Sequence, residues 1–163
     1  MLKDQLKKDL VAAFKEGNAV KKSVISVLNN AIKNRELDKR AKMVKEGIAE
    51  AEADAKAVLA DDEVTEVVMS EVKKRKDSIE QFTAGGRPEL AESEQTEIDV
   101  LMTYLPKQLT ADEIETIARE TLTEAGITEM KDMGKAVGAV MAKVKGRTEG
   151  NAVSAVVKKI LGA

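Results

Sequence analysis

The sequence predicts an all-α fold, in which an N-terminal bundle of about four helices precedes a small three-helix tail domain. Apolar residues recur at helical spacing along nearly all 163 residues, whereas alternating β-branched runs bounded by turn residues are missing. Glycines and the two prolines separate the periodic segments. A chain of this length buries roughly 70% of the surface that its extended form exposes, so its core needs no disulfide or metal.

The first two helices are expected to form an antiparallel pair. The first ends at Gly17, a residue that tolerates the left-handed conformation of helix ends, and Asn18 then caps the second helix. The short connection makes the two helices neighbours. Their inward faces comprise Leu2, Leu6, Leu10 and Phe14 in the first helix and Val20, Val24, Val27, Leu28, Ala31 and Ile32 in the second.

Residues 41 to 60 are rich in Ala, Glu and Lys and offer only a narrow apolar seam. The seam consists of Val44, Ile48, Ala51, Ala55 and Val58. Because alanine buries little area, we expect the segment either to extend the second helix or to stand out as a mobile arm. A solvated surface helix is the favoured interpretation, and a coil that binds a partner is the alternative.

A third and a fourth helix are expected between residues 61 and 105. Asp61 or Asp62 caps the third, Gly85 and Gly86 end it, and Pro88 opens the fourth, where a first-turn proline is tolerated. The inward residues are Val64, Val67, Val68, Val72, Ile79 and Phe82, followed by Leu90, Ile98, Leu101 and Leu105. Pro106 stops the fourth helix, so we place the domains at 1–106 and 107–163.

The tail domain begins with its own helix start signal, a capping box from Thr110 to Glu113. Such a box gives two backbone amides a partner and is worth about 1 kcal/mol. Gly126 ends this helix, and two more helices follow it. The inward residues of the three helices are Ile114, Ile117, Ala118, Leu122 and Ala125, then Met133, Val137, Val140, Met141 and Val144, then Val153, Val156, Val157, Ile160 and Leu161.

The composition excludes several classes of site. The chain has no cysteine and no histidine, which rules out disulfides, zinc sites, Cys-His pairs and His-based triads. Aromatic residues make up 2% of the chain, so no platform for stacking nucleobases is expected. Ser70 and Lys73 match a bare Ser-x-x-Lys spacing that occurs often by chance. We therefore expect no catalytic residue, no metal and no cofactor.

The sequence shows neither a membrane-spanning pattern nor a signal-peptide pattern. No apolar run approaches the roughly 20 residues that span a bilayer. The segment Met1 to Leu10 is too charged for a signal peptide. The expectation is a soluble cytoplasmic protein without a membrane partner.

Charge is unevenly distributed, although the net charge is only −2. Residues 107–129 hold 2 basic and 6 acidic side chains (−4), and residues 130–163 hold 7 and 2 (+5). The seven cations are the candidate RNA contacts: Lys131, Lys135, Lys143, Lys145, Arg147, Lys158 and Lys159. Between Lys143 and Gly150 they flank a turn whose Gly146 and Gly150 allow close backbone approach and whose end opens a helix, a setting that attracts phosphate. The alternative is a solvated turn that closes two packed helices.

Two further patterns have both a structural and a functional interpretation. Gly134 and Gly138 lie four residues apart with Ala142 continuing the row, which is typical of close helix packing and, alternatively, of a flush surface for RNA or a protein. The basic run Lys73 to Lys76 fans around its helix, so at least one stem should lie along apolar surface. A solvated face is favoured for that run, and a nucleic-acid contact is the alternative.

The sequence resembles the GatB/YqeY family, which is related to the C-terminal tail of the aspartyl/glutamyl-tRNA amidotransferase B subunit. The block from Met130 to Gly150 is similar to the family's tail signature, and Lys73–Phe82, Gly86–Glu92 and Tyr104–Leu109 resemble its central helix pair. Residues 23–34 look like its second helix, whereas residues 41 to about 60 are longer than the expected connection. The resemblance covers about 140 residues.

The resemblance implies a helical domain followed by a three-helix tail, and an association with glutamine-dependent tRNA amidation, a carbon-nitrogen ligase reaction. In the larger enzyme this tail contacts the outer corner of tRNA, and the kinase-like and amidase parts have no counterpart here. The leading hypothesis is therefore a non-catalytic module that binds tRNA or another folded RNA. A protein-binding or scaffolding role is the rival, and an enzyme is the third possibility.

Overall fold

The computed structural model describes residues 1–162 and confirms the all-α prediction, with eight α-helices, one short 3-10 helix and no strand in that range. The chain divides into two compact units, Met1–Tyr104 and a tail unit that begins at Leu105. Among the described residues, no helix combines the length and apolar character that a bilayer crossing requires.

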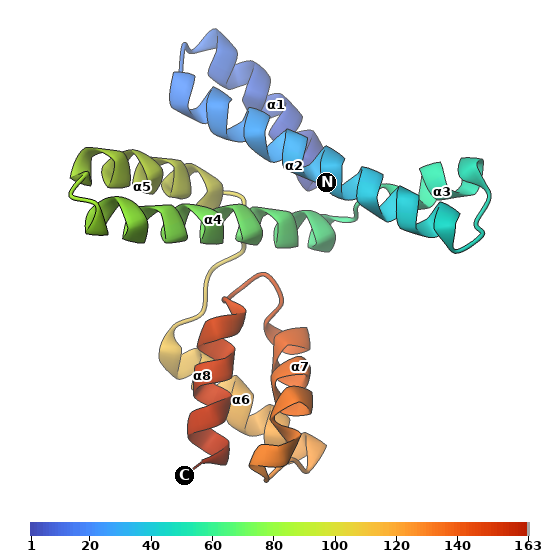
Figure 1. The fold of residues 1–163 in the computed structure, drawn as a ribbon, viewed down its shortest axis with the longest axis vertical. Helices are drawn as coiled ribbons and strands as arrows, with labels where there is room; N and C mark the ends of the chain where they lie inside the picture. Colours follow the sequence, from blue (N-terminus) through green and yellow to red (C-terminus); the bar gives the residue numbers. More distant parts are fainter. Residues whose placement is uncertain (163) are drawn as a thin grey trace. The chain divides into compact units, whose positions relative to one another are not determined.

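The N-terminal unit starts with an antiparallel hairpin of α1 (Leu2–Lys15) and α2 (Ala19–Lys45), visible in Figure 1. The predicted cap is confirmed, because the Asn18 side chain accepts a hydrogen bond of 2.9 Å from the Lys21 amide. The two helices bury Leu6 and Ala13 of α1 and Val24, Ile25, Leu28 and Ile32 of α2.

Phe14 is not part of the core, contrary to the prediction. Its side chain is 69% exposed, while its neighbour Ala13 is 1% exposed. A strict four-residue spacing advances about 40° per step around a helix, so the stripe from Leu2 has turned by about 120° when it reaches Phe14. The ring lies beside α2 instead, with the Lys22 ammonium 5.2 Å from its centroid.

The segment from 41 to 60 both extends α2 and folds back. After α2 ends, Gly47 adopts a positive φ of 92° and α3 (Glu50–Ala57) packs on α2. The turn resets the helical phase, and the predicted seam is therefore wrong: Ala51, Ala55 and Val58 are exposed. The buried residues are Ala53, Ala57 and Leu59. The prediction of about four helices for this unit did not include α3, which Figure 1 shows against the end of α2.

A second hairpin, α4 (Asp61–Ala84) and α5 (Pro88–Met102), completes the N-terminal unit. The cap of α4 is Ala60, whose amide donates 2.9 Å to the Glu63 carboxylate. Asp61 is already helical and accepts a hydrogen bond from the Leu2 amide at 2.9 Å, so it joins α1 to α4 rather than capping α4. The α4 helix packs against α1, α2 and α5.

The fourth predicted helix is shorter than expected, since α5 ends at Met102 rather than at Leu105. The chain then turns so that Tyr104 is buried and its hydroxyl donates 2.8 Å to Asp9 of α1. Burial and this hydrogen bond both raise the pKa of the Tyr104 hydroxyl. The end of the N-terminal unit is thereby held against α1.

The basic run on α4 contributes one cation to the interior. Arg75 is only 8% exposed and donates to Glu71 at 3.0 Å and to Glu97 of α5 at 2.9 Å. Glu71 also accepts from Lys74 at 2.6 Å. The guanidinium is therefore a link between α4 and α5, and it is not available to nucleic acid.

The tail unit contains α6 (Ala111–Ala125), the 3-10 helix η1 (Met130–Asp132), α7 (Met133–Val144) and α8 (Gly150–Leu161). The capping box of α6 is confirmed: the Thr110 amide donates 2.8 Å to Glu113, and the Glu113 amide donates 3.3 Å to the Thr110 hydroxyl. Gly126 ends α6 with a φ of 64°. The core of this unit is formed by Ile114, Ala118, Leu122, Ala136, Val140, Val144, Val153 and Val157.

Candidate nucleic-acid interface

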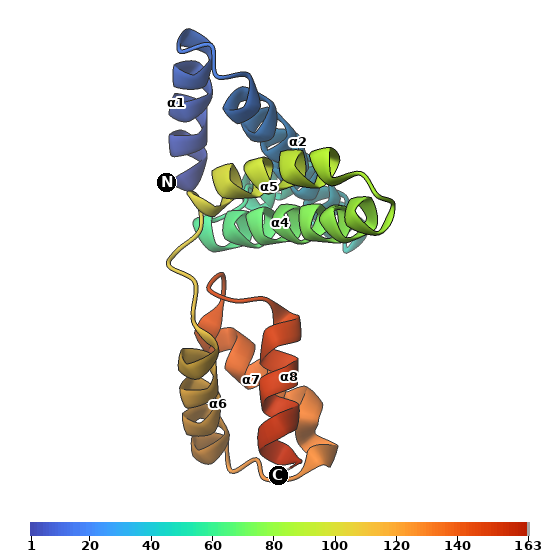
Figure 2. The same ribbon diagram turned by 90° about the vertical axis from the view of Figure 1, so that its left-hand side faces the viewer.

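The outer surface of α7 and α8 is the candidate interface. Figure 1 and Figure 2 agree that α6 crosses one side of the α7–α8 pair, which leaves the other side of the pair outside the three-helix core. On α7 the buried residues are Ala136, Val140 and Val144. Residues two positions earlier lie about 200° around the helix, so Gly134, Gly138 and Ala142 form the opposite face.

We call this surface the α7–α8 face; its residues are Lys131, Gly134, Lys135, Gly138, Ala142 and Lys158, all exposed. Lys131 contacts Glu129 at 2.8 Å and Lys135 contacts Asp132 at 3.5 Å. These are local, exposed pairs, each worth at most about 1 kcal/mol, so an incoming phosphate can replace the carboxylate. On α8, Lys159 points to α6, so Lys158, about 100° further around the helix, points away from it. Three of the seven predicted cations are thus exposed on the part of the tail unit that faces away from α6.

Lys143 and Lys159 belong to a different side of the tail unit. Lys143 contacts Glu124 of α6 at 2.5 Å, and Lys159 contacts Glu115 of α6 at 3.0 Å. Hydrogen bonds from Arg119 and Lys159 hold the pKa of Glu115 below its ordinary value. The opposite charges of α6 and of the last two helices therefore face each other within the fold.

Lys145 and Arg147 lie in the turn between α7 and α8, which packs against the segment that leads into α6. The Leu109 amide donates 2.8 Å to the Arg147 carbonyl, and the Gln108 side chain donates 3.0 Å to the Gly146 carbonyl. The Arg147 guanidinium donates 3.3 Å to the Lys107 carbonyl. The turn is thus held by the chain's own backbone rather than solvated.

The geometry of this turn does not favour an anion at its glycines. Gly146 is buried with a φ of 73°, so its backbone is covered by the tail unit itself. At the start of α8 the N-cap residue is Glu149, whose side chain makes no capping hydrogen bond but whose negative charge next to the helix start disfavours an approaching phosphate. The backbone of Gly146 is therefore closed to a ligand, whereas Gly150 is exposed with open space beside it, and close approach of a ligand to Gly150 stays a prediction.

Within the tail unit, the glycine row on α7 does not pack against another helix. A Cβ added at Gly134 or Gly138 would meet no heavy atom within 4 Å, the helix's own nearby backbone aside. The favoured interpretation, close packing of helices, therefore does not hold within this unit. What remains is a smooth helix surface that another molecule can approach closely.

The tail unit as a whole is nearly neutral, with 9 basic and 8 acidic side chains from Leu105 onward. Residues 1–162 contain no group of three acidic, His or Cys side chains that could hold a metal ion. The α7–α8 face can therefore bind a partner through charge and shape, with lysine ammonium groups as hydrogen-bond donors.

Sequence reasoning missed a second basic surface, on the α1–α2 hairpin. We call it the hairpin face; it comprises Lys7, Lys8, Val11, Phe14 and Lys15 of α1 and Lys22 and Lys33 of α2, all exposed. The sequence already indicated this face, because Lys7, Val11 and Phe14 follow one another at steps of four and three residues and therefore lie on one side of a helix. Assigning Phe14 to the core concealed it.

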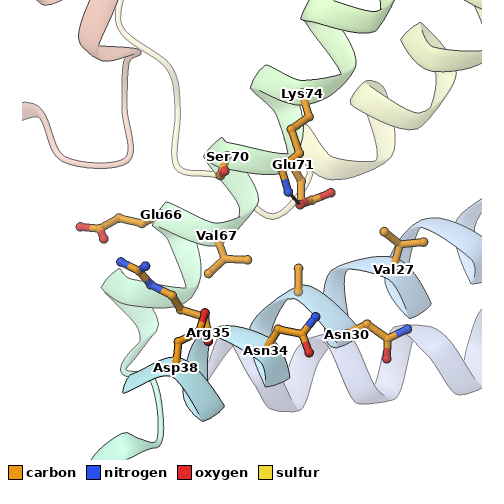
Figure 3. A pocket seen from close by; sticks show the side chains of 11 residues that line it. Val27, Asn30, Asn34, Arg35, Asp38, Glu66, Val67, Ser70, Glu71 and Lys74 are labelled. Carbon is orange, nitrogen blue, oxygen red and sulfur yellow. Dashed lines mark hydrogen bonds and ion pairs between the residues drawn. The ribbon is translucent and has the colours of Figure 1, made fainter. Parts of the chain in front are cut away.

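The N-terminal unit has an open groove of about 650 Å³ between α2 and α4, shown in Figure 3. Val27, Ala31 and Val67 form its apolar part, and Asn30, Asn34 and Arg35 of α2 face Ser70 and Lys74 of α4 across it. Lys73 does not line the groove and is exposed, whereas a lysine that serves as a base for a serine needs desolvation. The Ser-x-x-Lys spacing therefore forms no catalytic pair.

Comparison with known proteins gives a consistent result. The family described as Yqey-like protein matches residues 3–161. A Candida glabrata protein named altered inheritance of mitochondria protein 41, mitochondrial, is 34% identical over 122 residues, which are 73% of this chain and 59% of that protein. The protein of the same name from Pyrenophora tritici-repentis is 30% identical over 142 residues, covering 83% of this chain and 77% of its own length.

A third relative of that name, from Lachancea thermotolerans, is 31% identical over 114 residues, which cover 70% of this chain and 53% of the relative. The chain therefore spans little more than half the length of two of these relatives. Their names place them in mitochondria, which contradicts the cytoplasmic location that the sequence led us to expect.

Proposed function

This chain belongs to the YqeY-like protein family, whose domain is related to the C-terminal tail of the tRNA amidotransferase B subunit, and on that premise we propose that it is a binding module for tRNA or another folded RNA. The tail unit docks through its α7–α8 face. The chain acts by contact rather than by catalysis, so purified protein is expected not to amidate misacylated tRNA.

The observation that carries this proposal is the composition of the α7–α8 face. Gly134, Gly138 and Ala142 keep the surface of α7 low, so a sugar-phosphate backbone can approach the helix closely. Lys131, Lys135 and Lys158 border that row. Double-stranded RNA is recognised mainly by shape and by phosphate and 2′-hydroxyl contacts, which a smooth face with lysines at its edge can supply.

Electrophoretic retention of total tRNA over a salt series tests the proposal. Three phosphate contacts predict that log K falls with log salt at a slope between about −2 and −3. Replacing Lys131, Lys135 and Lys158 together by glutamine is expected to abolish most of that slope. Unchanged retention by this triple variant contradicts the docking surface.

The matched control removes cations from the other side of the tail unit. Lys143→Gln with Lys159→Gln takes away two lysines that α6 carboxylates already hold. We expect this variant to retain tRNA with a slope close to that of the unchanged protein. An equal loss in both variants would show that only total charge matters.

The glycine row also favours a second candidate function, the binding of a protein partner. Helices approach each other most closely where small residues line the contact, and Gly134 and Gly138 have no neighbouring helix within the tail unit. A partner that stays bound to the protein after RNase digestion, and that is lost on Gly138→Leu, supports this role. A partner released by RNase supports RNA binding.

A further inference from the structure

The hairpin face is a continuous strip of exposed cations and apolar side chains along α1 and α2. On α1, Val11 lies three or four residues from each of Lys7, Lys8, Phe14 and Lys15, so all five share one side of the helix. On α2, Lys22 reaches the Phe14 ring, which places it on the same side. Lys33 follows Lys22 by eleven residues, about three helical turns, and therefore shares its direction.

The lysines of this face have no carboxylate partner. In the described part of the chain, the ammonium groups of Lys7, Lys8, Lys15, Lys22 and Lys33 form no hydrogen bond or ion pair, and that of Lys22 lies over the Phe14 ring. The neighbouring cations of the same hairpin differ, because Lys3 pairs with Glu36 and Lys21 approaches Asp9 at 4.0 Å. Lys8 and Lys33 line hollows that also hold carboxylates, whereas Lys7, Lys15 and Lys22 line none of the described hollows. These three unpaired positive charges, which lie around Val11 and Phe14, are the strongest part of the hairpin face.

Two apolar side chains lie among these charges. Phe14 is 69% exposed and Val11 is 55% exposed, whereas the other two aromatic residues of the chain, Phe82 and Tyr104, are half-buried and buried. The Lys22 ammonium lies over the ring, 5.2 Å from its centroid. Apolar side chains surrounded by cations are costly in water and favourable where an apolar layer lies beneath a layer of anions.

We infer that the hairpin face docks on the surface of an anionic lipid bilayer. The five lysines contact headgroup phosphates, and Phe14 and Val11 enter the boundary between headgroups and acyl chains. Leu6 and Ala13, on the buried face of α1, stay packed in the core. The contact with the bilayer is therefore peripheral, and the helix hairpin does not need to unfold.

The charge distribution favours this orientation. The N-terminal unit carries 18 basic and 21 acidic side chains, a net charge of −3, although this face is basic. A negatively charged surface therefore repels the remainder of the unit and attracts the hairpin face, which orients the approach. A phosphate backbone alone provides no apolar layer for Val11, and this distinguishes a bilayer from RNA.

Vesicle binding tests the inference with the full chain. Vesicles of equimolar phosphatidylglycerol and phosphatidylcholine are expected to co-sediment the protein, and vesicles of phosphatidylcholine alone are not. Replacing Lys7, Lys15 and Lys22 by glutamine is expected to lower the partition coefficient on the order of 100-fold, about fivefold per lysine. The matched control is the glutamine triple at Lys131, Lys135 and Lys158, which is expected to change it less than twofold.

A fluorescent variant reports insertion directly, because the chain has no tryptophan. Phe14→Trp is expected to show a blue-shifted emission and quenching by brominated lipid on the anionic vesicles. Leu90→Trp, at an exposed apolar position of α5, is expected to show neither.

Three results overturn the inference: no retention by the anionic vesicles, an equal loss of retention in the two lysine triples, or a Phe14→Trp emission that vesicles leave unchanged. If the hairpin triple loses tRNA retention while vesicles never bind, the face belongs to RNA. Binding to tRNA through the tail unit is measured separately, so either proposal can fail while the other stands.

Discussion

The tail unit and the α1–α2 hairpin both carry a group of cations, and the fold treats the two groups differently. In the tail unit, Lys143 and Lys159 are held by carboxylates of α6, and Lys131 and Lys135 by carboxylates of their own turn. On the hairpin face, the five lysines have no such partner in the described chain. Residues 130–163 have the largest excess of cations in the sequence, yet most of these cations are paired with carboxylates in the fold, whereas the lysines of the hairpin face are not.

The difference shows what a count of charges along a chain measures. The excess of 7 basic over 2 acidic side chains after residue 129 is balanced by α6, which is close in space although it comes earlier in sequence. The hairpin lysines are interspersed with acidic residues in sequence, and of these Asp9 is bound to Tyr104 and Lys21, while Asp4 lies on the same side of α1 as Lys7 and Lys8 without pairing with either. A cation that pairs with a carboxylate of another helix is less available to a partner than one that is unpaired or paired only within its own exposed turn.

The largest expected effect comes from removing a cation that is buried and paired within the fold. Arg75→Ala leaves the buried Glu71 with only the exposed Lys74 as a partner and removes the contact to Glu97 of α5, so we expect the free energy of unfolding to fall by about 3 kcal/mol. Chemical denaturation followed by circular dichroism measures the loss. Lys73→Ala, an exposed neighbour, is expected to change it by less than about 0.5 kcal/mol. Similar losses in the two variants would show that burial does not distinguish the cations.

The same network predicts how stability depends on pH. Burial alone would raise the pKa of Glu71, but hydrogen bonds from Lys74 and Arg75 outweigh it and hold the pKa below its ordinary value. The folded state therefore binds the proton less readily than the unfolded state. The contribution is fully present above the unfolded value of about 4.3 and is lost as the pH falls through the lower folded value.

The measurement is the melting temperature between pH 6 and pH 3, for the unchanged chain and for Glu71→Gln. The variant is expected to be less stable at pH 6 and to lose less stability on acidification. Glu120→Gln, an exposed change for which no ion pair is recorded, serves as the control and is expected to keep the pH dependence of the unchanged chain. Parallel curves for all three proteins contradict the assignment.

Local features of the fold were predictable from sequence, and features that depend on distant packing were not. The Asn18 cap and the Thr110–Glu113 box were predicted because each is complete within four residues. The reversal at Gly47 was missed, since an alanine-rich seam looks alike whether a helix continues or folds back. The pairing of α7 and α8 lysines with α6 depends on which helix faces lie together, which periodicity within one helix does not specify.

Alanine substitution is expected to have smaller effects on stability, and these effects are opposite in sign for the glycine row and for the glycine in the α7–α8 turn. Gly134 is helical with open space beside it, so Gly134→Ala is expected to stabilise the tail unit by about 0.5–1 kcal/mol. Gly146 has a φ of 73°, and Gly146→Ala is expected to destabilise it by about 1–2 kcal/mol. Thermal unfolding measures both. If Gly134→Ala is stabilising yet weakens tRNA retention, the row serves contact rather than folding.

The smallest effect comes from releasing cations that α6 holds. Glu115→Gln with Glu124→Gln leaves Lys143 and Lys159 in place and removes their carboxylates. If pairing is what distinguishes the tail unit from the hairpin face, tRNA retention at low salt should rise a few-fold and its salt dependence should steepen, because two more ammonium groups can meet phosphates. The control, Glu80→Gln with Glu92→Gln, changes net charge equally at exposed sites of the N-terminal unit. An equal rise in the control would mean that net charge, and not the release of these two lysines, governs binding.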